Sequence, residues 1–197
     1  MIMLIAITGN LGSGKSTLRR IFERQGHATY DSDEIVSELY KKKEIIDLIG
    51  KEFGKEVISG GTVDRKLLAK MVFNSSIKLK KLDQLIHPLV ARKIQLINHA
   101  DSLVFVEVPL LFEAHMEKLF DKIILTKAPH EVAKERAVKR GFAEEEFEKR
   151  VAAQFTADRL SKRAHYLIET TDSLSVLSEK AAEISKELSG SQNWRGF

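Results

Sequence analysis

Short apolar runs alternate with amphipathic segments along most of the chain. Three runs are rich in branched and aromatic residues and predict buried parallel strands; they cover residues 3–8, 103–108 and 122–126. Residues 28–31 and 166–168 are candidates for two further strands. The segment 16–24 predicts a helix, because Leu18 and Phe22 fall on one side of it. Gly26 follows and ends this helix. Strands that alternate with helices predict an α/β fold with a parallel sheet.

Two longer stretches interrupt this alternation. Residues 34–95 have helical periodicity and no clear strand, and residues 129–156 form a highly charged helical stretch. Long helical insertions between core strands are typical of subdomains and lids. We therefore predict three parts. Residues 1–33, 96–128 and 157–197 form a core, residues 34–95 form a helical subdomain, and residues 129–156 form a lid.

The composition narrows the class of protein. The 197 residues include no cysteine, which excludes disulfides and cysteine-based zinc sites. No apolar run reaches the length of a membrane span, and the apolar start of the chain is too short for a secretory signal. The net charge of +4 suits an anionic substrate and is too small to indicate nucleic acid. We expect a cytoplasmic protein that acts on small molecules, without a nucleic-acid or membrane partner, as a monomer or small homo-oligomer.

The stretch ITGNLGSGKST follows the first predicted strand and opens the first predicted helix. Its Gly9-x-x-x-x-Gly14-Lys15-Ser16 spacing fits a phosphate-binding loop (P-loop). Glycines let backbone N–H groups approach phosphate oxygens, and the helix adds its positive end. Lys15 is predicted to bind the β- and γ-phosphates of ATP, and the Ser16 hydroxyl to bind Mg²⁺. The predicted ATP-binding residues of the loop are Gly12, Ser13, Gly14, Lys15, Ser16 and Thr17. The alternative is a glycine-rich surface turn.

A phosphate-binding loop alone does not select a reaction. GTPases usually carry an Asn/Thr-Lys-x-Asp segment, but here Thr126-Lys127-Ala128 is followed by Pro129. No Asp-x-x-Gly switch follows the strand at 103–108. These absences and the modest charge disfavour a GTPase and a nucleic-acid-dependent ATPase. A kinase of small molecules remains the best class.

The YDSDEI segment adds a candidate catalytic group. It follows the second predicted strand, and ligands bind at the carboxyl ends of strands in open α/β sheets. The Asp33 carboxylate could accept the proton of an acceptor hydroxyl and orient that hydroxyl toward the γ-phosphate. The alternative is that an aspartate or serine of this segment only caps the next helix.

Several motifs, in order, resemble the dephospho-CoA kinase family. They are ITGNLGSGKST, YDSDEI, FGKEVISGGTVDRKLLAKMVF, LDQLIHPLV, VEVPLLFE and the RAVKRG…RVAAQ segment, and they span about 150 residues. The resemblance implies a P-loop NTPase fold, in which helices flank a five-stranded parallel sheet. A helical substrate subdomain and a helical lid are additions to this core. It also implies transfer of phosphate from ATP, with Mg²⁺, to the 3′-hydroxyl of dephospho-CoA. Another kinase of the nucleoside monophosphate kinase type is the alternative.

The resemblance also implies substrate-binding residues, namely Thr8, Asp33, Arg65, His87, Leu111 and Phe112. Asp64 is expected to cap a helix that starts near Arg65, where a cation opposes the helix dipole and so favours an anionic partner. A salt bridge to a nearby carboxylate is the alternative for Arg65. His87-Pro88 predicts a break in the helix. The apolar Leu111 and Phe112 are equally suited to the core.

In the predicted lid, Arg136 and Arg140 lie four residues apart and so share one helix face. We expect them to bind ATP, and Arg140 to stabilise charge in the transition state. A solvated charged face is the alternative.

The sequence departs from the family pattern at four positions. Glu107 stands where aspartate is usual, Ala133 where glutamine is usual, His165 where aspartate is usual, and Thr170 where asparagine is usual. The departures at Ala133, His165 and Thr170 affect the expected adenine contacts rather than the phosphate chemistry.

Overall fold

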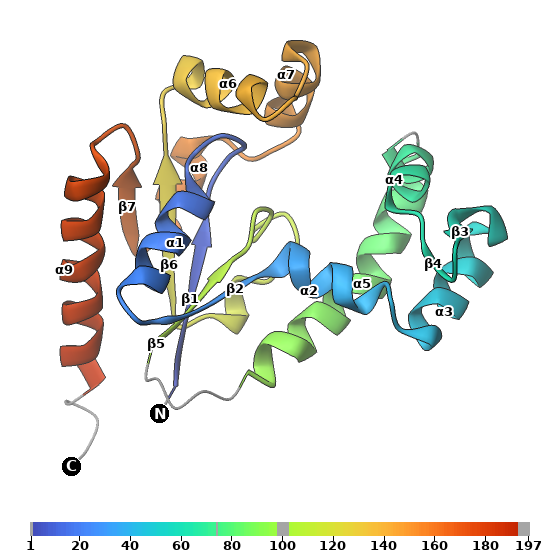
Figure 1. Ribbon diagram of the computed structural model, residues 1–197, viewed down its shortest axis with the longest axis horizontal. Helices are drawn as coiled ribbons and strands as arrows, with labels where there is room; N and C mark the ends of the chain where they lie inside the picture. The colour runs from blue at the N-terminus through green and yellow to red at the C-terminus, as the bar shows by residue number, and fades with distance from the viewer. Residues whose placement is uncertain (1, 74, 98–102, 193–197) are drawn as a thin grey trace. The chain divides into compact units, whose positions relative to one another are not determined.

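The computed structural model describes residues 2–73, 75–97 and 103–192. The chain divides into two compact units. The first combines Met1–Asp31 with Asn98–Phe197, and the second is Ser32–Ile97. Figure 1 labels their helices and strands, and each unit is described separately below.

The first unit contains a sheet of five parallel strands in the order β2–β5–β1–β6–β7 (Figure 1). The strands are β1 Met3–Thr8, β2 Ala28–Asp31, β5 Leu103–Glu107, β6 Lys122–Lys127 and β7 Tyr166–Glu169. Every residue of β5 is buried, as expected of an interior strand covered on both faces. The predicted α/β fold with a five-stranded parallel sheet is confirmed, and each strand lies at the segment predicted for it.

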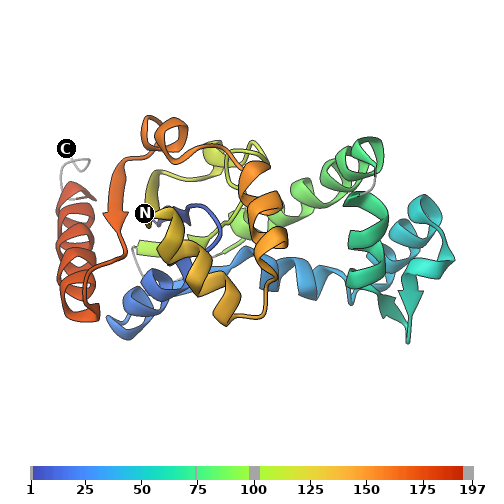
Figure 2. The same ribbon diagram turned by 90° about the horizontal axis from the view of Figure 1, so that it is seen from above.

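The helices of the first unit are α1 Lys15–Arg24, α6 His130–Lys139, α7 Glu144–Ala152, α8 Ala157–Ser161 and α9 Leu174–Gln192, with a 3₁₀ turn, η2, at Glu117–Leu119. One apolar side of α1 packs with α9 against the same sheet face, and Figure 2 shows the two helices on that side. The ring of Phe22 in α1 stacks on Phe105 of β5, with centroids 3.8 Å apart. The predicted apolar side of the first helix therefore forms part of the main core.

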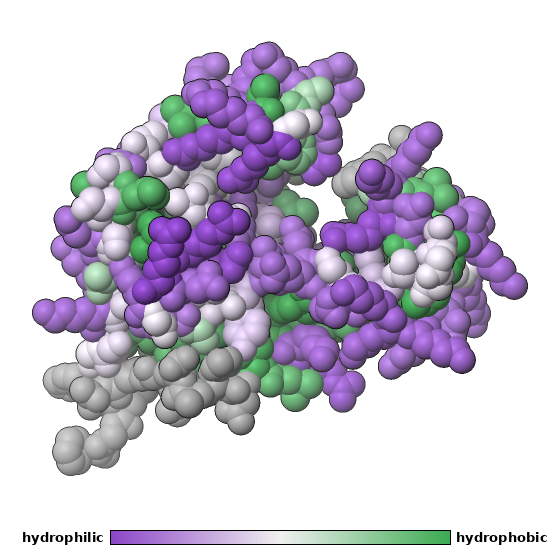
Figure 3. All heavy atoms as spheres, viewed as in Figure 1, coloured by the Kyte–Doolittle hydropathy of each residue, from purple (hydrophilic) through white to green (hydrophobic). Residues whose placement is uncertain are grey.

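Helices α6 and α7 form a smaller cluster of their own. Ala133, Ala137 and Phe147 are buried there, and Leu11 of the glycine-rich loop packs against them. Much of their outer surface is hydrophilic on the face that Figure 3 shows. It carries ion pairs between residues four apart, including Lys149 with Glu145 at 2.7 Å. Such exposed pairs stabilise a helix only slightly, whereas the apolar cluster packs α6 against Leu11 of the loop.

The second unit is mainly helical. Its elements are α2 Ser32–Leu39, α3 Lys43–Phe53, η1 Lys55–Val57, β3 Ile58–Ser59, β4 Thr62–Val63, α4 Arg65–Phe73 and α5 Ser76–Gln95. The antiparallel hairpin of β3 and β4 turns through Gly60 and Gly61, which both have positive φ. Sequence analysis predicted no strand in this region, because two-residue strands are too short to show alternation. As predicted, Asp64 caps α4: its Oδ1 accepts the N–H groups of Lys66 and Leu67, both at 3.0 Å.

The predicted helix break at His87-Pro88 is wrong. Both residues lie inside α5, which runs without interruption from Ser76 to Gln95. Proline removes one backbone hydrogen bond and usually bends or ends a helix. Here Ile86, Val90 and Ile94 bury one side of α5 on both sides of the proline, and this packing outweighs the lost bond.

Among the described residues, no helix is both long enough and apolar enough to cross a membrane.

The start of β7 offers a test of the fold by pH. The ring Nδ1 of His165 accepts the backbone N–H of Ile123 at 3.1 Å, which requires a neutral ring at that atom. Burial, with a smaller effect of the Lys122 charge, lowers the pKa of His165. The unfolded chain therefore takes up this proton first, and stability is lost as pH falls below the ordinary histidine pKa of about 6.5.

We expect a His165→Gln variant, which stays neutral, to lose less thermal stability than wild type between pH 7.5 and 5.5. Unfolding midpoints at the two pH values check this. All other titrating groups are shared by the two proteins, so equal losses would contradict the proposed role of His165.

Candidate functional site

The glycine-rich loop connects β1 to α1 in the first unit. Gly9, Gly12 and Gly14 have φ angles of 147°, 78° and 89°, which only glycine adopts readily. A Cβ at Gly12 would lie 2.3 Å from the Ala133 carbonyl oxygen. The glycines are therefore required by backbone conformation and close packing. Helix α1 begins directly after Gly14, so its first N–H groups, which have no acceptor within the helix, make this end of the sheet a ready anion site.

Lys15 folds into the loop. Its ammonium donates to the carbonyl oxygens of Gly9 at 2.8 Å and Asn10 at 3.0 Å, and the residue is 8% exposed. The positive charge of Lys15 is thus held inside the loop, next to the place where a bound anion would lie. Thr17, also predicted to bind ATP, is half-buried in the first turn of α1.

Ser16 meets a buried carboxylate. Its hydroxyl donates to Oε1 of Glu107, the last residue of β5, at 2.8 Å. Nε of Arg19 donates to the other oxygen, Oε2, at 3.2 Å. The Glu107 side chain is 5% exposed and that of Arg19 is 13% exposed, so each charge needs the other. Sequence analysis missed Arg19, although its place three residues after Ser16 puts it on the same side of the helix.

These residues can be compared with the needs of a divalent ion. Among the described residues, no group of three or more His, Cys, Asp or Glu side chains could hold a metal. Mg²⁺ often takes only one or two protein oxygens and completes its shell with phosphate and water. The adjacent Ser16 hydroxyl and Glu107 carboxylate are oxygen donors of the right kind, so the donor set fits Mg²⁺ bound together with a phosphate.

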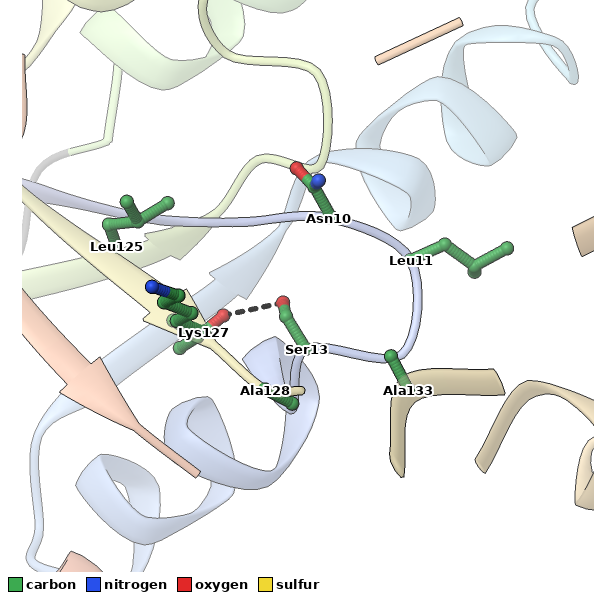
Figure 4. Close-up of a pocket in the computed structure, with 8 residues that line it drawn as sticks. Asn10, Leu11, Ser13, Leu125, Lys127, Ala128 and Ala133 are labelled. Carbon is green, nitrogen blue, oxygen red and sulfur yellow. Dashed lines mark hydrogen bonds between the residues drawn. The ribbon is translucent and has the colours of Figure 1, made fainter. Parts of the chain in front are cut away.

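Buried hydroxyl-bearing residues link the loop to β1 and β6. The Ser13 and Thr126 hydroxyls lie 2.7 Å apart, and Thr126 donates to the Thr8 carbonyl at 3.1 Å. Figure 4 shows the Ser13–Thr126 bond in a small pocket that Ala133 also lines. Thr8, predicted to bind substrate, is 2% exposed, and its carbonyl accepts the Thr126 bond. Sequence analysis gave Thr126 no such role, because the contact joins segments more than a hundred residues apart.

Arg136 lies against the outside of the loop. Its guanidinium donates to the Thr170 carbonyl at 2.6 Å and to the Thr170 hydroxyl at 2.8 Å. A longer contact of 3.4 Å reaches the Gly12 carbonyl. Arg140, by contrast, is exposed and lies just past the end of α6, with Gly141 following at a φ of 93°. Arg136 is thus in the last turn of α6 and Arg140 is the residue that caps its C-terminal end.

The predicted substrate residues Asp33 and Arg65 are linked within the second unit. The Ser37 hydroxyl donates to the Asp33 carbonyl and accepts from Nη1 of Arg65, both at 2.7 Å. The Asp33 and Arg65 residues are exposed, in the first turns of α2 and α4.

His87 lies elsewhere in this unit, on α5. Its Nε2 is 3.5 Å from Oδ1 of Asp83. Burial raises the pKa of Asp83, and the charge of His87 partly opposes the rise. Burial also raises the pKa of Tyr40, which feels the charges of both Arg65 and Asp83. Arg65, Tyr40, Asp83 and His87 thus form one electrostatically connected group.

The structure supports the core alternative for two predicted substrate residues. Leu111 is 0% exposed and Phe112 is 1% exposed, so neither side chain offers surface to a ligand. The Arg163 guanidinium lies over the Phe112 ring at 4.4 Å. Glu113, next in the chain, accepts the N–H of Phe155 at 2.9 Å. This loop is therefore held to the segments on either side of α8, and ligand contacts for Leu111 and Phe112 stay a prediction.

Comparison with known proteins places the chain in a family. The family model described as dephospho-CoA kinase matches residues 3–175. A dephospho-CoA kinase of Aquifex aeolicus is 36% identical over 189 residues, covering 93% of this chain and 96% of the relative. The crystal structure of TT1252 from Thermus thermophilus, 35% identical, has a TM-score of 0.84 and covers 95% of this chain and 98% of that one. Shikimate kinase from Acinetobacter baumannii, at 16% identity and a TM-score of 0.58, covers 97% of this chain and 95% of its own, and shares the P-loop kinase fold. The chain belongs to the dephospho-CoA kinase family.

Proposed function

We infer that this protein transfers the γ-phosphoryl group of ATP to the ribose 3′-hydroxyl of dephospho-CoA, giving coenzyme A and ADP. The observation that carries the proposal is the phosphate loop, with Lys15 inside it and Ser16 beside Glu107, in a chain matched by the family model from residue 3 to 175. The fold alone would not select this reaction, because shikimate kinase shares it. Family membership supplies the acceptor.

Small molecules are the only partners that the proposal needs. The net charge of +4 suits two anionic nucleotides and is too small to favour nucleic acid. An enzyme that acts on dissolved nucleotides would work in the cytoplasm, as a monomer or a small homo-oligomer.

On the donor side, the loop from Gly12 to Thr17 holds the ATP phosphates. Phosphate oxygens replace the Gly9 and Asn10 carbonyls as acceptors for Lys15. This exchange is favourable, because phosphate oxygens carry negative charge that the carbonyls lack, which adds Coulomb attraction to the Lys15 ammonium. Ser16 and Glu107 would hold Mg²⁺, which supplies positive charge against the β- and γ-phosphates.

On the acceptor side, the Asp33 carboxylate receives the proton of the 3′-hydroxyl. The oxygen of that hydroxyl bonds to the γ-phosphorus as the bond from phosphorus to the β-phosphate oxygen breaks, and ADP leaves. Asp33 follows Asp31 by two residues, and Asp31 pairs with Glu107 at the end of the sheet. Chain connectivity alone keeps Asp33 within roughly 7 Å of Asp31. Arg65 and His87 bind the anionic and polar parts of dephospho-CoA.

Residues 129–156 act as a lid over ATP in this proposal. Arg140 is exposed at the end of α6 and is therefore available to the phosphates. Its guanidinium stabilises the charge of the transition state, and closure excludes water that would compete with the acceptor hydroxyl. Arg136 instead supports the loop from outside.

The proposal is tested by supplying ATP and Mg²⁺ with either dephospho-CoA or AMP as acceptor. We expect kcat/KM for dephospho-CoA to exceed that for AMP by at least ~100-fold, because polar groups built for one acceptor are left unpaired by another. Production of ADP by a coupled assay measures both. Equal or faster turnover of AMP would favour a nucleoside monophosphate kinase instead.

A further inference from the structure

Thr170 ties the phosphate loop to the end of β7. The residue follows β7 directly and is 4% exposed. Its Oγ1 lies 2.8 Å from the Ser13 carbonyl oxygen and 3.4 Å from the Lys127 carbonyl oxygen. A hydroxyl has one hydrogen to donate, and the shorter contact with better geometry takes it. The Thr170 hydroxyl therefore donates to Ser13.

Arg136 fixes the direction of this bond. A guanidinium can only donate, so its 2.8 Å contact with Thr170 Oγ1 occupies a lone pair of that oxygen. A second bond, 2.6 Å from Arg136 to the Thr170 carbonyl, holds the same residue from the backbone side. With one lone pair bound by a cation, the hydroxyl directs its hydrogen away from Arg136, where the Ser13 carbonyl is the nearer of the two acceptors.

The Ser13 carbonyl belongs to the same peptide group as the Gly14 N–H. A trans peptide is planar, so its C=O and N–H point in opposite directions. Holding the Ser13 oxygen toward Thr170 therefore turns the Gly14 N–H to the opposite side of the loop. Gly14 has a φ of 89° and no side chain of its own to resist rotation of this peptide. Only outside contacts can fix it.

Packing strengthens this restraint. A Cβ on Gly14 would lie 2.8 to 2.9 Å from atoms of the Thr170 side chain. The Thr170 methyl and hydroxyl thus fill the space beside Gly14 and leave no room for the loop to shift outward.

We infer that Thr170 is a positioning residue for the nucleoside triphosphate: its hydroxyl, oriented by Arg136, holds the Ser13 carbonyl outward and so keeps the Gly14 N–H directed at a phosphate oxygen. The inference rests on the proposed function only in taking ATP as the ligand. Thr170 itself touches no reacting atom in this role.

The test compares three variants by the Kd for ATP, measured calorimetrically without acceptor. Thr170→Val has the same shape without the hydroxyl, and we expect its Kd to rise about 10-fold, because a buried carbonyl loses its partner and the peptide is released. Thr170→Ser keeps the hydroxyl and should stay within about 2-fold of wild type. Thr170→Ala also lacks the hydroxyl and should show the same rise in Kd as Thr170→Val. It replaces Thr170→Val as the test if the valine variant fails to fold.

A matched control comes from the second unit. The Thr62 hydroxyl also donates to a backbone carbonyl, that of Tyr40 at 3.1 Å. Thr62→Val removes a bond of the same kind at an exposed residue away from the loop and should leave the Kd for ATP unchanged. In turnover assays, Thr170→Val should raise KM for ATP and leave KM for dephospho-CoA unchanged.

A purely structural Thr170 would give another pattern. The unfolding midpoint would fall in Thr170→Val while the Kd for ATP, measured well below that midpoint, stayed at the wild-type value. That result, or equal losses of affinity in the serine and valine variants, would overturn the inference. The binding measurement needs no acceptor, so wild-type protein that binds ATP without phosphorylating dephospho-CoA would refute the proposed function alone.

Discussion

An Asp33→Asn variant should bind ATP as tightly as wild type and lose about 10²- to 10⁴-fold in kcat. Asparagine has the same size as aspartate but cannot take the proton of the acceptor hydroxyl. Asp33 is exposed in the first turn of α2, so the change should not disturb packing. Steady-state kinetics with dephospho-CoA, together with calorimetric titration of ATP, separate the two effects.

Asp47→Asn is the matched control for this prediction. Asp47 is also exposed on a helix of the second unit, in α3, and the same charge is removed there. Its kcat should remain at the wild-type value. If kcat of Asp33→Asn also stayed within a few-fold of wild type, the role proposed for Asp33 as proton acceptor would be wrong.

Gly12→Ala should abolish measurable ATP binding and lower the free energy of unfolding by about 3 kcal/mol. The added methyl would lie 2.3 Å from the Ala133 carbonyl oxygen, so the loop and α6 must separate. The φ of 78° is strained for alanine as well. Both effects distort the loop that holds the phosphates. Urea unfolding and ATP titration measure them independently.

Gly26→Ala separates strain from collision. Its φ of 88° is close to that of Gly12, but an added Cβ would meet no atom within 4 Å. This variant should lose about 1 kcal/mol of stability from backbone strain and keep its ATP affinity. If Gly12→Ala behaved like Gly26→Ala, the close packing of the loop on α6 would have no functional consequence.

The sequence predicted features that depend on neighbouring residues. The strands follow from apolar runs, and the phosphate loop from glycine spacing between a strand and a helix. The cap at Asp64 was likewise predictable from its place before a helix. Each signal lies within a few residues, so no knowledge of the tertiary structure is needed.

Features built by distant contacts could not be predicted in this way. Ser13 and Thr170 are 157 residues apart, and Arg19 and Glu107 are 88 residues apart. No local pattern marks such partners. Pro88 shows the reverse case, in which a strong local signal is overridden by packing along α5. The apolar Leu111 and Phe112 were ambiguous, because core and ligand contacts favour the same residue types.

The central claim is that the phosphoryl group goes from ATP to the 3′-hydroxyl of dephospho-CoA. Phosphorus NMR of a reaction mixture with ATP, Mg²⁺ and dephospho-CoA tests it most directly. We expect a new phosphomonoester signal on the 3′-oxygen to appear in equal amount with ADP, and the product to match coenzyme A. ADP formed with free phosphate while dephospho-CoA remains unchanged, or a phosphoryl group attached to another oxygen, would contradict the account.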